Sequence, residues 1–289
     1  MFDAVAFAGG GNRCYWQAGF YEAAAPLLGL KPRLIVGVSA GAWSACCSVL
    51  GVGRRVNEIV ADGCSAGRRN FEWRAWRAEG SPWPVALMYR TLIEQTVTEE
   101  AFAALKAGPE ILIALARKPR RLPLALAIPL GIAVYQIEKA IGSPVHPRGG
   151  RALGFAPEYV AVSRAASRDD VVSALMASAS VPPFMPVGRI GGLAALDGGL
   201  VDNVPVDPLR EVEAQGGRTL VILSRLYKAF PLVEGRLYVQ PSERVPVGQF
   251  DITNPAGIRR AYEMGLQDGE AFARRLSTSA GRSAIEPIT

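Results

Sequence analysis

The first 50 residues repeat one local pattern, and this repeat constrains the fold more than any other feature of the sequence. A short apolar run, Asp3–Ala8, is followed by a glycine turn at Gly9–Asn12 and by a helix-forming stretch, Cys14–Leu28. A second apolar run, Leu34–Val38, leads directly into Ala40–Leu50, which is rich in small residues. Two successive strand–turn–helix units are typical of a β-sheet with helices packed against it. We therefore expect an α/β fold.

The same pattern returns in the second half of the chain, where Asn254 is expected to cap a final helix that has Pro255 at its first position. With 289 residues, 49% of them hydrophobic, the chain can bury one large core. We predict a single domain over residues 1–289, with residues 54–150 as an inserted lid or membrane-facing region. The other predicted strands are Tyr159–Ser163, the end of Gly188–Leu196, Thr219–Ser224 and Arg236–Gln240, and the other predicted helices are Asp169–Ser178 and Asn254–Arg275.

Residues Gly37-Val38-Ser39-Ala40-Gly41 fit the G-x-S-x-G pattern of a nucleophile elbow. The pattern follows an apolar strand and opens a helix, which is the context that its mechanics require. Such a turn holds the serine hydroxyl at the edge of the sheet, and the helix N-terminus behind it favours developing negative charge. Ser39 is therefore a candidate nucleophile, in preference to an ordinary turn serine.

The turn Gly9-Gly10-Gly11-Asn12-Arg13 also lies between a strand and a helix. Successive glycines let backbone N–H groups point into one concavity, which suits an anion. One interpretation is a dinucleotide loop, but Cys14 stands at the third glycine position and the strand ending at Val38 has no acidic residue for a ribose. The other is an oxyanion hole for acyl transfer, with Arg13 orienting the loop or attracting a phosphate.

A serine nucleophile needs a proton acceptor, and the chain contains a single histidine, His146. In the Ser–acid–His order of α/β-hydrolases, no obvious catalytic acid lies between Ser39 and His146, so we interpret His146 as a loop histidine. Asp197 is the better candidate because it ends an apolar strand and begins a glycine turn. Partial desolvation raises the pKa of a carboxylate, which can then accept a proton directly. The alternative, in which Asp197 only caps its turn, is less favoured beside an elbow and a glycine loop.

These three elements, in this order, resemble the patatin-like phospholipase family. Gly9–Arg13 is similar to the oxyanion loop of the family, Gly37–Gly41 to its serine elbow and Asp197-Gly198-Gly199 to its aspartate motif. Lesser similarities are Ala177–Val187 before the aspartate and Asn203-Val204-Pro205 after it. The sequence departs from the family at Cys14, where a glycine usually follows the basic residue.

The resemblance implies a three-layer α/β/α sheet with helices on both faces and a largely helical insertion. It also implies a serine acyl hydrolase with a Ser–Asp dyad, in which Ser39 is the nucleophile and Asp197 the base. The expected substrates are lipid acyl esters, phospholipids or lysophospholipids above all, cleaved through an acyl-enzyme. The expected oxyanion hole consists of Gly9, Gly10, Gly11 and Arg13, with the N–H groups of Gly10 and Gly11 binding the oxyanion.

The net charge of +6 is concentrated in residues 117–151, which hold seven basic residues and one acidic residue. Among them, Leu122–Ile137 is a 16-residue apolar stretch. A membrane-spanning helix needs about 20 such residues, so a span is disfavoured. We expect peripheral contact of residues 117–151 with an anionic membrane; a buried helix with a solvated basic lead-in is the alternative.

Other functions have less support. No recognition motif accompanies the positive charge, so no nucleic-acid partner is expected. No metal or cofactor is expected either, because the cysteines lack metal-ligand spacing. The N-terminus carries no targeting peptide, and we expect a cytoplasmic protein. The alternative function is a non-catalytic lipid-binding protein on a degenerate hydrolase scaffold, suggested by residues 117–151 and by Trp73, Trp76 and Trp83.

Overall fold

The structure, a computed structural model, describes residues 1–65, 69–73 and 82–279. Its strands are β1 (Ala4–Phe7), β2 (Leu34–Val38), β3 (Glu110–Arg117), β4 (Ala156–Ala161), β5 (Gly188–Ile190), β6 (Leu193–Asp197), β7 (Thr219–Ile222) and β8 (Arg236–Val239). Within the described part of the chain they form one sheet in the order β5-β6-β3-β2-β1-β7-β8, and β4 also pairs with β3. The five strands from β3 to β8 in this order are parallel, whereas β4 and β6 run antiparallel to β3.

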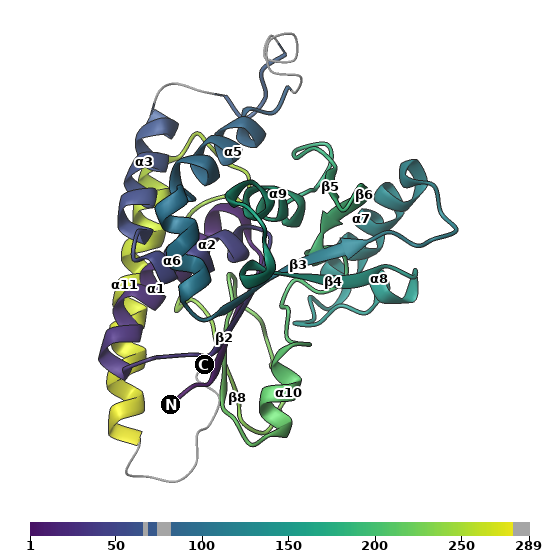
Figure 1. The fold of residues 1–289 in the computed structure, drawn as a ribbon. Helices are drawn as coiled ribbons and strands as arrows, with labels where there is room; N and C mark the ends of the chain where they lie inside the picture. Colours follow the sequence, from purple (N-terminus) through teal and green to yellow (C-terminus); the bar gives the residue numbers. More distant parts are fainter. Residues whose placement is uncertain (66–68, 74–81, 280–289) are drawn as a thin grey trace.

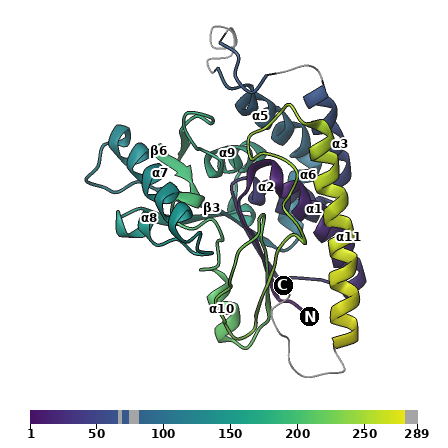
Figure 2. The same cartoon turned by 180° about the vertical axis from the view of Figure 1, so that it is seen from behind.

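Helices cover both faces of this sheet (Figures 1 and 2). The first face carries α1 (Cys14–Leu28), α2 (Ala40–Leu50), α3 (Gly53–Ser65), α5 (Pro84–Thr96), α6 (Glu99–Ala107), α9 (Arg168–Ser178) and α11 (Pro255–Ser279). The opposite face carries α7 (Leu124–Ile141), α8 (Gly149–Ala152) and α10 (Leu209–Ala214). Short 3-10 turns lie at η1 (Gly11–Arg13), η2 (Val162–Arg164) and η3 (Gly198–Leu200).

Alternating side chains along the buried strands build these layers. In β1, Val5 and Phe7 join the core beneath α1 and α11, whereas Ala4 and Ala6 join the smaller core beneath α10. Successive side chains of a strand point to opposite faces, so a strand that is apolar throughout must be covered on both sides. The observed three-layer α/β/α architecture follows from this, and it confirms the predicted fold class.

Strand β3 positions the ends of two other strands. Its first half pairs with β2, and the last pair joins Ala114 of β3 to Val38 of β2. At the next position β2 has ended, and Leu115 pairs instead with Asp197, the last residue of the antiparallel β6. Both β2 and β6 lie on the same edge of β3, since β4 occupies the other edge over Leu112–Arg117. The C-terminal ends of β2 and β6 therefore face each other.

The elements predicted at the N-terminus agree closely with the structure. Helix α1, strand β2 and helix α2 have the predicted bounds. At the start of α11, the Asn254 side-chain oxygen accepts a 2.8 Å hydrogen bond from the Gly257 N–H, as expected of a capping residue. Trp76, one of the three tryptophans noted in the sequence, lies outside the described residues.

Residues 54–150, predicted as an inserted lid or membrane-facing region, also supply part of the central sheet. They contain several helices, but they contain β3 as well, which lies between β2 and β6. The apolar stretch expected at Leu122–Ile137 forms α7, which continues to Ile141. Its 18 residues are long and apolar enough to cross a membrane by length and composition, and only 11% of them are buried. Its buried face, at Ala127 and Gly131, packs against the domain, and its outer face is exposed.

Candidate active site

Ser39 lies in a strained turn between β2 and α2. Its backbone has φ 56° and ψ −136°, a conformation that few L-residues adopt and that is typical of functional sites. The turn is tight because a Cβ at Gly37 would lie 2.4 Å from the Ala42 Cα, and one at Gly41 would lie 2.4 Å from the Ala8 oxygen. Only glycine fits at these two positions, as the elbow pattern predicts. Ser39 itself is 9% exposed, at the N-terminus of α2.

Asp197 is the residue that meets Ser39. The Ser39 hydroxyl lies close enough to the Asp197 carboxyl to lower its pKa, and the Asp197 Oδ1 accepts a hydrogen bond of 2.7 Å from the Gly199 N–H. Burial has the largest effect on the pKa of this carboxyl: Asp197 is 5% exposed, and desolvation raises its pKa to about 6, although Ser39 and the Gly199 N–H lower it. A carboxylate with this pKa is a far stronger base than one in water and is still mostly ionised at neutral pH.

A second serine, Ser178, stabilises the turn at Ser39 through two hydrogen bonds. The Ser178 hydroxyl, at the end of α9, accepts a 2.7 Å hydrogen bond from the Ser39 N–H and donates one of 2.7 Å to the Ala114 oxygen of β3. Ser178 thereby ties the nucleophile turn to the strand that also pairs with Asp197. Because the Ser39 N–H is engaged in this way, it is not available to bind an oxyanion.

The glycine loop lies against Ser39, with its Gly9 carbonyl held from two sides. This oxygen accepts hydrogen bonds of 2.8 Å from the Asn203 Nδ2 and 2.6 Å from the Ser224 hydroxyl. The Gly9 N–H donates to the Asn203 oxygen at 2.9 Å. A Cβ on Gly9 would lie 3.3 Å from the Ser39 Cβ, so the loop and the nucleophile are in contact.

The other residues of the glycine loop, Gly10, Gly11 and Arg13, contribute to it in different ways. Arg13 donates from Nε to the Gly10 oxygen at 3.2 Å and so orients the loop. Gly11 has φ 56°, and a Cβ there would lie 2.1 Å from the Gln249 oxygen, so the loop requires glycine at this position. Within the described part of the chain, the N–H groups of Gly10 and Gly11 donate no hydrogen bond. Of the four residues predicted for the oxyanion hole, these two carry available donors, since the Gly9 N–H is engaged.

An apolar cavity of about 50 Å³ opens beside Ser39. Ser39 and Gly11 lie on its wall together with apolar side chains such as Trp43, Met185 and Phe250. Its apolar lining suits a hydrocarbon chain whose ester end lies at the serine.

An aromatic row connects this cavity with the surface. The Phe250 ring stacks on Phe184 at 4.9 Å, Phe184 meets Trp83 at 4.6 Å, and Trp83 meets Phe71 at 5.0 Å between ring centroids. Phe71 in turn lies 6.4 Å from Trp73, and these last two side chains are 46% and 65% exposed. The row is a continuous line of aromatic side chains from the surface to the wall of the cavity.

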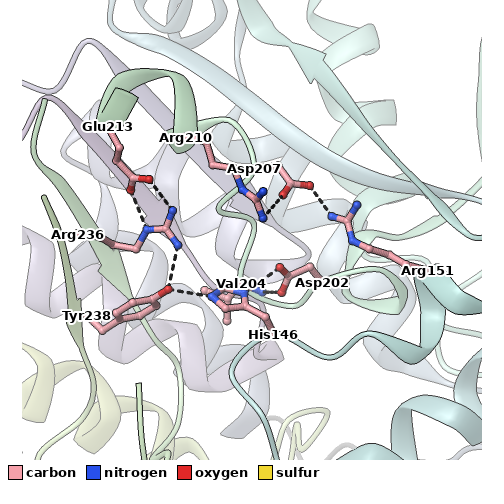
Figure 3. A network of polar contacts seen from close by, with 9 residues as sticks. All are labelled: His146, Arg151, Asp202, Val204, Asp207, Arg210, Glu213, Arg236 and Tyr238. Atoms are coloured by element: carbon pink, nitrogen blue, oxygen red, sulfur yellow. Dashed lines mark hydrogen bonds and ion pairs between the residues drawn. The ribbon is translucent and has the colours of Figure 1, made fainter. Parts of the chain in front are cut away.

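His146 belongs to a different polar network (Figure 3). Its Nδ1 lies 2.9 Å from Asp202 Oδ2 and its Nε2 lies 2.8 Å from the Tyr238 hydroxyl, which also accepts a bond from Arg236. Arg236 forms a buried two-pronged ion pair with Glu213. The interpretation of His146 as a non-catalytic loop residue agrees with this placement. The network supports the turn that begins at Asp202 and continues into the loop-binding Asn203.

The residues that hold the Ser39 turn and the glycine loop in position were not predicted from the sequence. Ser178 lies within Ala177–Val187, and Asn203 lies within Asn203-Val204-Pro205. Both segments resemble the family, but the resemblance did not indicate what these two residues do. Ser224 and Gln249 had no signal in the sequence, since their contacts with the glycine loop depend on the sheet order. No group of three or more His, Cys, Asp or Glu side chains in the described ranges could hold a metal ion.

The comparison with known families agrees with the site. The patatin-like phospholipase profile matches residues 5–210, which is most of the chain and includes the loop, the elbow and the aspartate motif. The chain belongs to this family and is a lipid hydrolase.

More distant comparisons add little. No curated protein matches the chain. The solved structure of VipD from Legionella pneumophila is similar over 95% of this chain and 67% of its own, with 10% sequence identity and a TM-score of 0.46. A similarity this remote adds no argument about function.

The buried Asp197 makes stability depend on pH in a defined direction. Its folded-state pKa of about 6 exceeds the ordinary value of 3.8, so the folded state holds the proton more tightly and stability falls as pH rises from about 4 to 6. We expect Asp197→Asn to raise the unfolding free energy at pH 8 by up to about 3 kcal/mol, and to change it little at pH 4. Thermal melts of both proteins at the two pH values measure this. A variant that is less stable than the wild type at pH 8 would contradict it.

Proposed function

We propose that the protein hydrolyses acyl esters of phospholipids or lysophospholipids through a Ser39–Asp197 dyad and an acyl-enzyme. The observation that carries the proposal is the position of Ser39, which lies in a strained turn on the wall of an apolar cavity and faces the buried Asp197 carboxyl. The family membership supports the lipid substrate, and the local geometry supports the assignment of roles.

In the first half of the reaction, the Ser39 Oγ attacks the ester carbonyl while Asp197 takes its proton. The carbonyl oxygen becomes an oxyanion and is bound by the N–H groups of Gly10 and Gly11, with the α2 N-terminus adding favourable potential. Asp197 then returns the proton to the departing alcohol as the ester C–O bond breaks. The acyl group stays on Ser39 with its chain in the cavity.

In the second half, Asp197 takes a proton from a water molecule that attacks the acyl-enzyme. The same N–H groups bind the second oxyanion, and the proton passes to the Ser39 Oγ as the fatty acid leaves. The raised pKa of Asp197 suits this alternation, because the group must gain and lose a proton in each half-reaction near neutral pH.

Two features support contact with a membrane surface. The outer face of α7 exposes Leu126, Leu130, Ile137 and Ile141, of which Ile141 is 83% exposed. The second feature is positive charge beside α7, to which the nearby basic residues contribute unequally. Arg117 and Arg151 are each neutralised by an ion pair, with Glu158 and Asp207 respectively. Arg120 and Arg121 are exposed next to the start of α7. We therefore narrow the membrane contact of residues 117–151 to α7 and these two arginines.

The catalytic assignment is tested with Ser39→Ala. We expect it to abolish release of fatty acid from phospholipid vesicles, to within background, while it leaves the thermal melt close to that of the wild type. Mass spectrometry of the lipids identifies which ester is cut. Wild-type protein that binds vesicles but cleaves no lipid would favour a non-catalytic lipid-binding protein, and undiminished cleavage by Ser39→Ala would remove the serine from the mechanism.

The membrane contact is tested by changing Arg120 and Arg121 together to glutamine. Each basic residue near an anionic surface contributes about 1 kcal/mol, so we expect the double variant to bind anionic vesicles about tenfold or more weakly. Hydrolysis of a soluble short-chain ester should not change. The double variant Lys31→Gln/Arg55→Gln, at exposed basic positions away from α7, is the control of equal charge. Equal binding by the two double variants would contradict the assignment.

A further inference from the structure

His146 is bound on both sides by polar side chains from other parts of the chain (Figure 3). It lies in the segment between α7 and α8, whereas Asp202 follows η3 and Tyr238 belongs to β8. Its Nδ1 lies 2.9 Å from the Asp202 Oδ2, and its Nε2 lies 2.8 Å from the Tyr238 hydroxyl. The His146 and Asp202 side chains are only 24% and 12% exposed, so water competes little for these contacts. Because both ring nitrogens are engaged, any effect of His146 on the reaction passes through its two partners.

The hydrogen bonds of this network run in one direction, which fixes the proton of the imidazole. Arginine can only donate, so the Tyr238 oxygen accepts the 3.1 Å bond from Arg236 Nη1 and the Tyr238 O–H is left to donate to His146 Nε2. A neutral imidazole that accepts at Nε2 carries its hydrogen on Nδ1 and donates it to Asp202. Arg236 is itself held by a buried ion pair with Glu213. The network therefore presents one N–H of fixed direction to the Asp202 carboxylate.

Asp202 transmits this restraint to Asn203, the residue that binds the glycine loop. The Asp202 Oδ1 accepts a 2.9 Å hydrogen bond from the Val204 N–H, so the two residues that flank Asn203 are tied to each other. Asn203 holds the Gly9 backbone twice: its Nδ2 donates to the Gly9 oxygen at 2.8 Å, and its backbone oxygen accepts from the Gly9 N–H at 2.9 Å. Loss of the imidazole would leave one oxygen of a buried carboxylate without its partner, and the turn around Asn203 would relax to satisfy it.

The position of Gly9 matters because the expected oxyanion donors follow it directly. Among the residues that the structure describes, Gly10 and Gly11 carry the loop N–H groups that are available to an oxyanion. A Cβ on Gly9 would lie 3.3 Å from the Ser39 Cβ, so the loop is packed against the nucleophile. A shift of Gly9 therefore moves the donors relative to the carbonyl under attack. Such donors act within a narrow range of distance, and a misplacement of about 1 Å can cost about 100-fold in rate.

We propose that His146 is a positioning residue for the oxyanion hole: through Asp202 and Asn203 it holds the glycine loop in place for the transition state. The inference rests on the proposed function. It gives the one histidine of the chain a part in the reaction without proton transfer, since the serine proton goes to Asp197. A residue of this kind contributes to transition-state binding and changes the binding of the ester itself very little.

Two amide variants separate the roles of the two ring nitrogens. Asparagine can place its Nδ2 donor where Nδ1 of the imidazole lies, whereas the longer glutamine places its amide nearer the Nε2 position. Both variants are measured on p-nitrophenyl butyrate, a soluble ester, so that membrane contact does not enter. We expect His146→Gln to lower kcat about tenfold or more with KM within about twofold of the wild type. His146→Asn is the matched control, and we expect it to keep kcat within about threefold, because the bond to Asp202 is retained.

A transition-state analogue distinguishes displaced donors from a smaller share of folded enzyme. An alkyl trifluoromethyl ketone adds to the Ser39 Oγ as a hemiketal, and the serine proton passes to Asp197 while the ketone oxygen becomes an anion in the place of the oxyanion. We expect its inhibition constant for His146→Gln to rise by the same factor as kcat falls. A variant that only folded less well would show a lower kcat per mole of protein and the inhibition constant of the wild type.

Three results would overturn the inference. Unchanged kcat in His146→Gln would show that the loop does not depend on the imidazole. Equal losses in the two amide variants would show a requirement for imidazole chemistry, as expected of a general base. A lower kcat with an unchanged inhibition constant would show a purely structural role. Failure of the proposed function itself looks different, because the wild type would then cleave the ester in no Ser39-dependent way.

Discussion

Strand β3 continues past the end of β2, and the geometry of the site depends on this difference in length. The partners of Ala114 and Leu115, adjacent on β3, are Val38 and Asp197, although these two residues are far apart in sequence. Backbone hydrogen bonds to one rigid strand thus set the distance between the nucleophile turn and the carboxylate. Ser178 reinforces the arrangement, since it bonds both the Ser39 N–H and the Ala114 oxygen. A site fixed by a sheet needs no long side chain to span it, which suits a pair as short as serine and aspartate.

The same arrangement of strand ends explains why the pKa of the Asp197 carboxyl is raised. Because two strand ends meet within a covered sheet, the carboxyl is nearly out of water, and its pKa rises to about 6. The burial costs stability at neutral pH and makes the carboxylate a useful base, a compromise that is common where function and stability compete. The proposed dyad needs no imidazole to accept the serine proton, and the one histidine of the chain is engaged with Asp202 and Tyr238.

The sequence was sufficient for the parts of the site that depend on local rules. Ser39, the glycines around it and the helix behind it follow from a strand that runs into a tight turn, and all of these lie within a few residues of one another. Asp197 could be proposed from its own strand end and turn. The contact between Asp197 and Ser39 could not be derived locally, because it depends on which strands are neighbours.

Strand β3 is one of the elements that the local sequence pattern did not predict. Its sequence EILIALAR contains leucine, alanine and glutamate, which favour helix, and it lies in a segment that is otherwise helical. Pairing with β2, β4 and β6 overrides that preference. The charge of residues 117–151 is a similar case. It is one basic block in sequence, yet in the fold Arg117 forms an ion pair with Glu158, Arg120 is exposed and Lys139 is half-buried.

The most direct test of the Ser39–Asp197 pair is the rate at which a fluorophosphonate labels Ser39 as a function of pH. The reagent needs no lipid surface, so the rate reports proton transfer from Ser39 alone. We predict that the rate falls tenfold per pH unit below about pH 6, where Asp197 takes up a proton, and that Asp197→Asn labels about 1000-fold more slowly at pH 8 without this dependence. A wild-type rate that is flat from pH 8 to pH 4, or an Asp197→Asn variant that labels as fast as the wild type, would contradict the account.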